Sequence, residues 1–205
     1  MEKVDFKKKL KHLYTASAKK VDVVTVPKMN YLMVDGKGDP NEGFPAAAGS
    51  LFGIAFCLKF MFKKMKKPKG YYEYTMPPLE SLWWSASGKF DIKKISDWRW
   101  TVLLMQPDYI DVKLKDMAIE QLMKKREEAP LRAVRLESFD EGLCAQSLHI
   151  GSYMNEAPTI EKILSAIKDS NHTPHGKHHE IYLNDPHRIP EAKLKTILRY
   201  PIKKK

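Results

Sequence analysis

The sequence predicts an α+β fold of two pseudo-twofold related β-α-β-β modules, which form a mainly antiparallel sheet with helices on one side and a central groove. One observation is that the order strand, helix, strand, strand occurs in each half of the chain. Another is that some residues recur 108 positions later, namely Tyr74 with Tyr182 and Pro78 with Pro186. Two modules joined in this way leave a groove between them, where ligands commonly bind.

The first module is expected over residues 21–110, after a basic and helical N-terminal segment at residues 1–20. Residues 21–34 are rich in Val, Met, Tyr and Leu and contain Pro27, which is typical of an edge strand or a bent strand. Glycines and a proline in residues 35–40 then end this strand in a turn.

A long apolar helix is expected after this turn, at residues 44–65, with Asn41 as a residue that can cap it. Strand-like runs follow at residues 71–76 and 97–105, with the pair Trp83-Trp84 between them. These segments complete the first module in the order strand, helix, strand, strand.

The second half begins with a connecting helix at residues 111–130, where residues 114–128 show the apolar spacing of an amphipathic helix. The second module, residues 131–205, repeats the order of the first. Its expected elements are an extended segment 133–150, a helix 158–167 opened by a proline, and strands 178–183 and 195–202.

Charge and cysteine content limit the functional classes. The 205 residues carry a formal net charge of +11, so nucleic acid, a membrane surface and anionic ligands are possible partners. Much of the excess lies in lysine runs, which are more often solvated faces than binding sites. Two cysteines without paired spacing predict a cytoplasmic protein without disulfides. We find no export signal or uninterrupted apolar span and expect no membrane crossing.

Several runs of the sequence resemble the GyrI-like small-molecule-binding family. They occur in the family's order and extend over nearly all of the chain after about residue 20. The runs are PPLESLWW (77–84), DWRWTVLLMQPD (97–108), HIGSY (149–153), HHEIYLNDP (178–186) and PEAKLKTILRYPI (190–202).

This resemblance implies a two-module fold with a central pocket for bulky aromatic compounds, many of them cationic. The same fold is the effector domain of BmrR-type multidrug-responsive regulators, but we expect no DNA-binding domain here because fewer than about 20 residues precede the first strand. Stand-alone members of the family include cyclopropanoid cyclopropyl hydrolases, which open cyclopropane-bearing DNA-alkylating compounds. The resemblance therefore implies a detoxifying hydrolase, with a non-catalytic drug-binding or sequestering protein as the alternative.

Glu180 is the first candidate for a catalytic residue. Side chains alternate along a strand, so Glu180 and Tyr182 share one face of strand 178–183 while Ile181 and Leu183 face the core. A carboxylate in an aromatic pocket either meets a cationic ligand or has a raised pKa suited to proton transfer. The alternative is that Glu180 lies on the surface and pairs with a lysine.

In the hydrolase interpretation, Glu180 orients or deprotonates the water that attacks the strained ring. A tyrosine, Tyr74 or Tyr182, then hydrogen-bonds the carbonyl that gains negative charge as the ring opens. Other aromatic side chains are expected to line a slot for a flat ligand, although core packing competes for each of them. These expected ligand-binding residues, in addition to Tyr182, are Tyr153, Trp83, Trp98, Trp100 and Phe56.

Trp98 and Trp100 share a strand face with apolar residues, so at least one of the two is expected in the core. Which of them faces the ligand is left open.

We predict no metal site and no cofactor. Five of the seven histidines lie within residues 172–187, but their spacing matches no zinc motif, and the glycines of residues 36–38 lack the third glycine of a dinucleotide-binding loop. The basic and aromatic run at residues 59–70 has the composition of a membrane-surface or nucleic-acid-binding helix, which is a rival function. The oligomeric state is not predicted.

Overall fold

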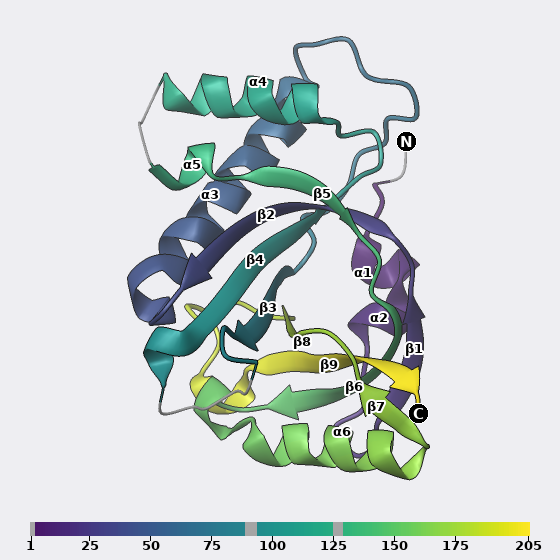
Figure 1. Cartoon of the computed structure of the whole chain (residues 1–205). Helices are drawn as coiled ribbons and strands as arrows, with labels where there is room; N and C mark the ends of the chain where they lie inside the picture. Colours follow the sequence, from purple (N-terminus) through teal and green to yellow (C-terminus); the bar gives the residue numbers. More distant parts are fainter. Residues whose placement is uncertain (1–2, 89–93, 125–128) are drawn as a thin grey trace. The chain divides into compact units, whose positions relative to one another are not determined.

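The computed structural model describes residues 3–88, 94–124 and 129–205, and the chain folds as two compact units whose elements are labelled in Figure 1. Each unit combines segments that lie far apart in the sequence. Unit 1 consists of Met1–Asp5, Met29–Pro77 and Trp84–Phe139, and unit 2 consists of Phe6–Lys28, Pro78–Trp83 and Asp140–Lys205. This division differs from the consecutive modules expected at residues 21–110 and 131–205, because short segments are exchanged between the two halves.

Unit 1 is a three-stranded antiparallel sheet with helices packed on it. Strand β2 (Met29–Lys37) lies between β4 (Trp98–Gln106) and β5 (Arg135–Phe139). The long helix α3 contacts β2 and β4 and also packs against α4 and α5. These helices span Pro40–Met61 (α3), Val112–Met123 (α4) and Ala129–Arg132 (α5).

Helix α3 begins where its sequence supplies a cap. The Asp39 carboxylate accepts a hydrogen bond from the Asn41 backbone N–H, and Pro40 occupies the first helical position, where no N–H is needed. The expectation that Asn41 is the cap was therefore wrong by two residues. The buried side of α3 carries apolar residues at helical spacing, including Leu51, Ile54 and Leu58, which fixes this side toward the strands.

By length and composition alone, α3 is also the one helix among the described residues that is long and apolar enough to cross a membrane. A core helix passes the same test, and α3 packs its buried side against β2 and β4.

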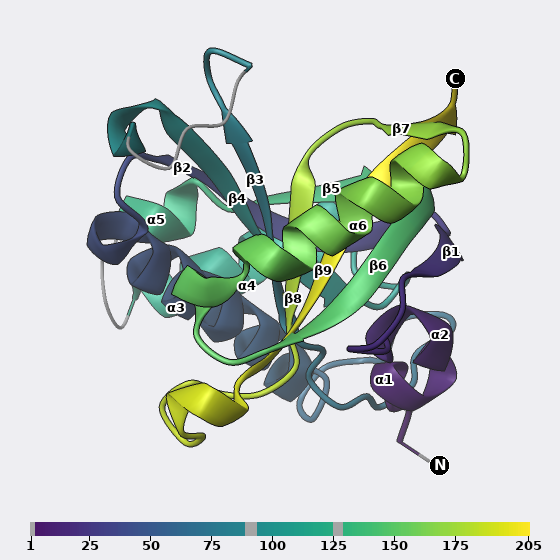
Figure 2. The same ribbon diagram turned by 90° about the horizontal axis from the view of Figure 1, so that it is seen from below.

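Unit 2 contains a five-stranded antiparallel sheet in the order β1-β6-β9-β8-β3, with β7 paired to the far end of β9. Helix α6 (Ala157–Asp169) lies across β6 and β9 (Figure 2). The strands are β1 (Asp22–Val26), β3 (Leu79–Ser85), β6 (Gly142–Ile150), β7 (His172–Pro174), β8 (His178–Tyr182) and β9 (Lys195–Lys204).

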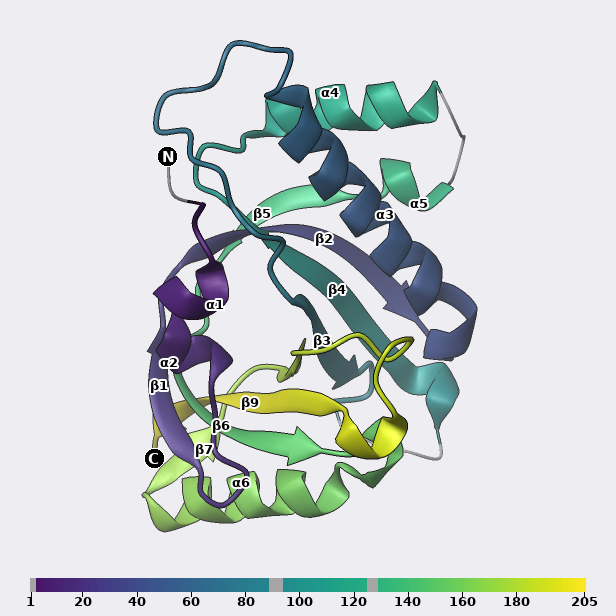
Figure 3. The same cartoon turned by 180° about the vertical axis from the view of Figure 1, so that it is seen from behind.

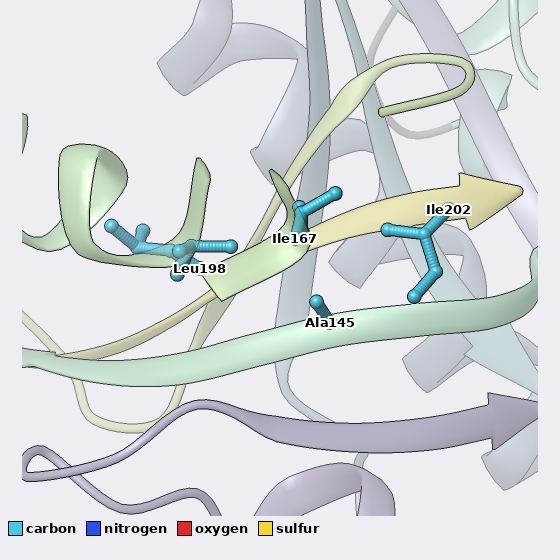
Figure 4. Packing of buried hydrophobic residues seen from close by; sticks show 5 residues of the cluster. Ala145, Ile167, Leu198 and Ile202 are labelled. Carbon is cyan, nitrogen blue, oxygen red and sulfur yellow. The ribbon is translucent and has the colours of Figure 1, made fainter. Parts of the chain in front are cut away.

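A small apolar core holds α6 on the sheet (Figure 4). Ile163 and Ile167 are one helical turn apart, and they meet Ala145 of β6 and Leu198 and Ile202 of β9. Each of these side chains is almost fully buried. Because strand side chains alternate, this packing decides which residues of β6 and β9 point toward α6 and which point to the opposite face.

The N-terminal segment belongs to unit 2 and is helical, as expected, in two short helices, α1 (Phe6–Lys9) and α2 (Lys11–Tyr14). Figure 3 shows them beside β1. Three short 3-10 turns complete the description, at Ile95–Asp97, Tyr153–Asn155 and Glu191–Lys193.

The α+β class and the antiparallel pairing are confirmed, and the main helices and most strands lie where expected. Residues 21–34 form two strands rather than one, because Pro27 separates β1 of unit 2 from β2 of unit 1. The strand expected at residues 71–76 was wrong: only Tyr74 forms a bridge, to Val4, and the prolines that follow cannot donate ladder hydrogen bonds.

The recurrence of Tyr74 at Tyr182 in the sequence does not correspond to equivalent positions in the structure. Tyr74 lies before β3, whereas Tyr182 lies within β8, so the two residues do not occupy equivalent places. The expected helix at residues 114–128 is α4 up to Met123, and residues 125–128 lie outside the described part of the chain.

Candidate functional site

The candidate site lies on one face of β8, on the side of the sheet that carries α6. Glu180 pairs with Ser81 of β3 on one side and with Leu198 of β9 on the other. Because Leu198 packs against α6, Glu180 faces the same side of the sheet. The Tyr182 hydroxyl donates a 2.7 Å hydrogen bond to Glu180 Oε2, which confirms that the two side chains share this face.

A directed chain of hydrogen bonds ends on the Glu180 carboxylate. Trp83 Nε1 lies 2.7 Å from Ser81 Oγ, and Ser81 Oγ lies 2.7 Å from the Tyr182 hydroxyl. An indole nitrogen only donates, and the single phenol proton of Tyr182 is used on Glu180, so the Ser81 hydroxyl donates to the tyrosine oxygen. Every donor therefore points toward Glu180, which fixes the orientation of its carboxyl group.

A second carboxyl group, Glu156, approaches Glu180 from the N-terminal end of α6. One ligand atom each from Glu156, His178 and Glu180 lies within 4.8 Å of the other two. Burial, and then the neighbouring Glu180 charge, raises the pKa of Glu156 to about 9. Glu156 is 6% exposed, and its Oε1 has no hydrogen-bond partner within the described part of the chain.

Aromatic rings surround this acidic group. The Tyr153 ring meets the Tyr182 ring edge-on, with centroids 5.6 Å apart, and the Tyr200 ring lies 4.8 Å from the imidazole of His178. Burial, followed by the charge of Glu180, raises the pKa of Tyr153 and of Tyr182, so both phenols keep their protons at neutral pH. The site thus combines carboxyl groups with aromatic walls and phenol donors.

The site has no basic counter-ion among the described residues. Among the described residues, the one side chain within ion-pair distance of Glu180 is His178, whose Nε2 lies 3.3 Å from Oε1. The side chains of both remain partly accessible, at 14% for His178 and 12% for Glu180. On a chain of net charge +11, carboxyl groups without a lysine or arginine partner in the described ranges favour a cationic or electron-poor ligand.

Comparison with known proteins places the chain in a family. The sequence profile of the GyrI-like small molecule binding domain matches residues 19–203. This chain belongs to the GyrI-like family. It is therefore a small-molecule-binding domain, as the resemblance implied.

Two solved structures from Listeria innocua are similar to the GyrI-like chain over 98% of its length and over 100% of their own. One is described as an uncharacterized conserved protein, with 38% identity and a TM-score of 0.90. The other is described as a hydrolase encoded by lin2189, with 37% identity and a TM-score of 0.90. The C-terminal domain of EcmrR shares the fold at 9% identity, with a TM-score of 0.61 over 91% of this chain and 98% of that domain. The comparison of this chain with curated proteins found no match.

Four of the predicted site residues of the GyrI-like chain, Glu180, Tyr182, Tyr153 and Trp83, lie together in unit 2, as described above. The other predicted residues belong to unit 1 and remain predictions: Tyr74, Trp98, Trp100 and Phe56.

Trp100 is 3% exposed and packs inside unit 1. Its ring covers Gly36, where an added Cβ would lie 2.0 Å from the ring, and it also contacts the ring of Phe44 at 5.5 Å. Gly36 therefore provides the space that this indole fills, and Trp100 has a core role in unit 1. Trp98, two residues earlier, is only half-buried.

Tyr74 is 1% exposed, and the Lys59 ammonium lies 5.2 Å from its ring centroid. Burial raises the pKa of the Tyr74 phenol, which therefore stays protonated. Phe56 is 44% exposed and stands between Phe52 and Phe60 on α3, with ring centroids 6.4 and 6.3 Å away. An exposed aromatic row of this kind can contact a ligand.

The sequence did not reveal Glu156 as a site residue. It lies 24 positions from Glu180, and only packing of α6 on the sheet brings the two together. The available signal was an acidic residue directly before Ala157-Pro158, at a helix N-terminus, where carboxylates are favoured.

The opposite face of β8 carries a second ionic group, which is fully buried. His179 Nδ1 lies 2.9 Å from Glu141 and its Nε2 lies 3.0 Å from Glu80. Arg199 contacts the other Glu141 oxygen at 3.2 Å. Burial alone lowers the pKa of His179, but the adjacent carboxylates outweigh it and raise the pKa to about 9. His179 is therefore protonated at neutral pH.

This buried network also attaches the N-terminal segment. The Tyr14 hydroxyl donates to Glu80 at 2.9 Å, and the Arg199 guanidinium donates to the carbonyl oxygen of Leu13 at 2.7 Å. Gln146 donates in the same way to the carbonyl of His12. The network thus has a structural explanation, and we do not include it in the functional site.

Proposed function

We propose that this GyrI-like chain binds bulky aromatic compounds, including cationic ones, and hydrolyses cyclopropane-bearing DNA-alkylating compounds with Glu180 as the catalytic carboxylate. The observation that carries the proposal is the Glu180 carboxylate itself, partly accessible, surrounded by aromatic rings and oriented by the Tyr182 hydroxyl. A 37% identical structure is described as a hydrolase, which supports turnover rather than binding alone.

In the proposed reaction, Glu180 accepts a proton from a water molecule as the water oxygen bonds to a ring carbon. The carbon–carbon bond of the cyclopropane breaks, and its electron pair moves onto the conjugated carbonyl oxygen of the substrate. That oxygen then takes up a proton, so the net change is the addition of one water molecule. We propose the Tyr74 phenol as the hydrogen-bond donor to this oxygen, since its raised pKa keeps it protonated.

The remaining predicted aromatic residues are assigned to substrate contacts in the same proposal. Tyr153, Tyr182 and Trp83 adjoin Glu180 in unit 2, and Phe56 presents an exposed ring in unit 1. We further propose that the protein acts in the cytoplasm as a detoxifying enzyme, which is supported by two cysteines, Cys57 and Cys144, that form no disulfide.

A second candidate function is binding without turnover. The observation that favours it is the Glu180 carboxylate, which has no lysine or arginine within ion-pair distance in the described part of the chain and lies beside aromatic rings. Such a site binds a delocalised organic cation by charge and ring stacking, without any chemical step. A sequestering protein would have the same pocket and would differ only in product formation.

Product formation separates the two functions. A cyclopropane-bearing alkylator is incubated with the wild-type protein, with Glu180→Gln and with Glu161→Gln, and ring-opened product is followed by mass spectrometry. Glu161 is an exposed carboxylate of α6, so its variant controls for loss of charge. We expect product with wild type and Glu161→Gln and only the buffer rate with Glu180→Gln. Equal product in all three and in buffer, together with binding of the compound, would favour sequestration.

A further inference from the structure

Glu156, His178 and Glu180 lie close enough together to bind one metal ion, although no motif in the sequence indicates such a site. Two carboxylates and one imidazole each offer a ligand atom, and all three atoms lie within 4.8 Å of one another. Three protein ligands of the nitrogen and oxygen type, with a further position left open, are typical of zinc sites that bind a water molecule or a small ligand.

Unsatisfied polar atoms in the cluster provide a second observation. Glu156 is only 6% exposed, and its Oε1 has no hydrogen-bond partner within the described ranges. Neither ring nitrogen of His178 has one in those ranges either. Buried polar atoms without partners are uncommon and costly, and a coordinated cation would satisfy Glu156 Oε1 and one ring nitrogen of His178 at once.

The spacing of two ligand atoms already fits a metal ion. His178 Nε2 and Glu180 Oε1 are 3.3 Å apart without forming a hydrogen bond. Two ligands at bond lengths of about 2.0–2.1 Å around a tetrahedral ion are separated by roughly 3.3 Å. Glu156 offers the third ligand atom, which lies within 4.8 Å of the other two.

The second oxygen of Glu180 is already held in a way that favours coordination. Oε2 accepts the Tyr182 hydrogen bond, so Oε1 remains the available ligand atom. The Tyr182 hydroxyl is in turn held by Ser81, which places a supporting hydrogen bond behind a metal ligand.

We propose that Glu156, His178 and Glu180 form a binding site for a divalent transition-metal ion of the zinc class. The proposal concerns the same site as the proposed function but does not require cyclopropane hydrolysis. Because the ion would occupy Glu180 Oε1, it would compete with a cationic organic ligand for the site, and the proposed hydrolysis with Glu180 as the base would be a property of the metal-free protein.

Isothermal titration of the full-length, chelator-treated protein with zinc chloride at pH 7 tests the proposal without any substrate. We expect one high-affinity site in the wild type, weakened at least about tenfold, or 1.4 kcal/mol, in both Glu156→Gln and His178→Gln. His175→Asn is the matched control because His175 is an exposed histidine three residues away, and we expect it to bind zinc as the wild type does.

Cobalt(II) absorption spectra provide a second measurement that does not depend on affinity alone. A tetrahedral site with an imidazole ligand gives visible bands that should vanish in His178→Gln and persist in His175→Asn. Circular dichroism melting confirms that each variant is folded. Zinc binding that is absent from the wild type, or that survives in both Glu156→Gln and His178→Gln, would overturn the proposal, whereas absent hydrolysis in chelated buffer bears only on the proposed function.

Discussion

The two faces of β8 carry similar carboxyl and imidazole groups, but these groups differ in their burial and in their ion pairs. On one face, His179 lies between Glu80 and Glu141, and Arg199 completes a network in which each charged group has a partner of opposite sign. On the other face, the carboxyl groups of Glu156 and Glu180 lie near His178 and have no lysine or arginine partner among the described residues. Paired charges that are fully buried maintain the fold, whereas the partly accessible carboxyl group of Glu180 is available to a ligand.

The difference arises from a one-residue alternation along the strand. His179 and Glu180 are adjacent, yet their side chains point to opposite faces, so they enter different environments. His179 is 0% exposed, and the Glu180 side chain is 12% exposed. Removing a partner from the first face should therefore cost stability, and removing a charge from the second should cost function while stability stays level or rises.

The largest effect is expected for Arg199→Met. This change keeps the volume but leaves Glu141 buried beside an incomplete network, which typically costs about 3–5 kcal/mol. For a chain of this size we expect a fall in Tm of roughly 10 °C by calorimetry. Arg188→Met is the control, since its ion pair with Asp185 is exposed and should change stability by less than about 1 kcal/mol. Equal effects of the two changes would remove the distinction between the faces.

The next effect is the pH dependence of the His179 network. The pKa of His179 is raised from 6.5 to about 9 in the folded chain, so its stabilising contribution is complete below pH 6.5 and is lost as the pH rises through 9. Urea unfolding in the Glu156→Gln background should show a decrease on the order of 2–3 kcal/mol between pH 6.5 and 9.5. That background removes the other group whose pKa is near 9. A flat profile would mean that His179 is neutral when folded.

Glu156→Gln is expected to stabilise the protein. The folded pKa of about 9 means that folding binds a proton at Glu156, which costs free energy at every pH above its ordinary value of 4.5. A neutral glutamine avoids this cost, so we expect a gain of about 1–2 kcal/mol at pH 7 that disappears near pH 4. Urea unfolding at the two pH values measures it, and Glu161→Gln should show neither change. A loss of stability at pH 7 would contradict this account.

The smallest effect is expected for Ser81→Ala. This change removes the hydroxyl that accepts from Trp83 and donates to Tyr182, at a cost of about 1 kcal/mol in stability. Because the chain of donors ends on Glu180, we also expect a lower rate of ring-opened product. Ser165→Ala, at an exposed serine of α6, is the control. A rate equal to that of the wild type would show that the chain does not position Glu180.

The sequence predicted the part of the site that depends on local geometry. Alternation along residues 178–183 was enough to place Glu180 beside Tyr182. The long apolar run and the proline at the start of residues 158–167 were enough to predict α3 and α6. Local sequence patterns did not predict Glu156 as a site residue or the partners of His179. Those contacts join residues that only the packing of β3, β6 and β9 brings near β8.

The division into units was beyond sequence reasoning for a similar reason. Pro27 was recognised as an interruption, but no local signal shows that the strands before and after it join different units. The same limit applies to Trp100, whose core position depends on the space that Gly36 leaves on the neighbouring strand.

The central claim is that the Glu180 face of β8 is the functional face, and one paired measurement on Glu180→Gln tests it most directly. The Tm and the initial rate of ring-opened product are determined on the same preparation. We predict a Tm equal to or above that of the wild type and a product rate equal to that of buffer. A variant that keeps the wild-type rate, or loses activity only because it unfolds, would contradict the account.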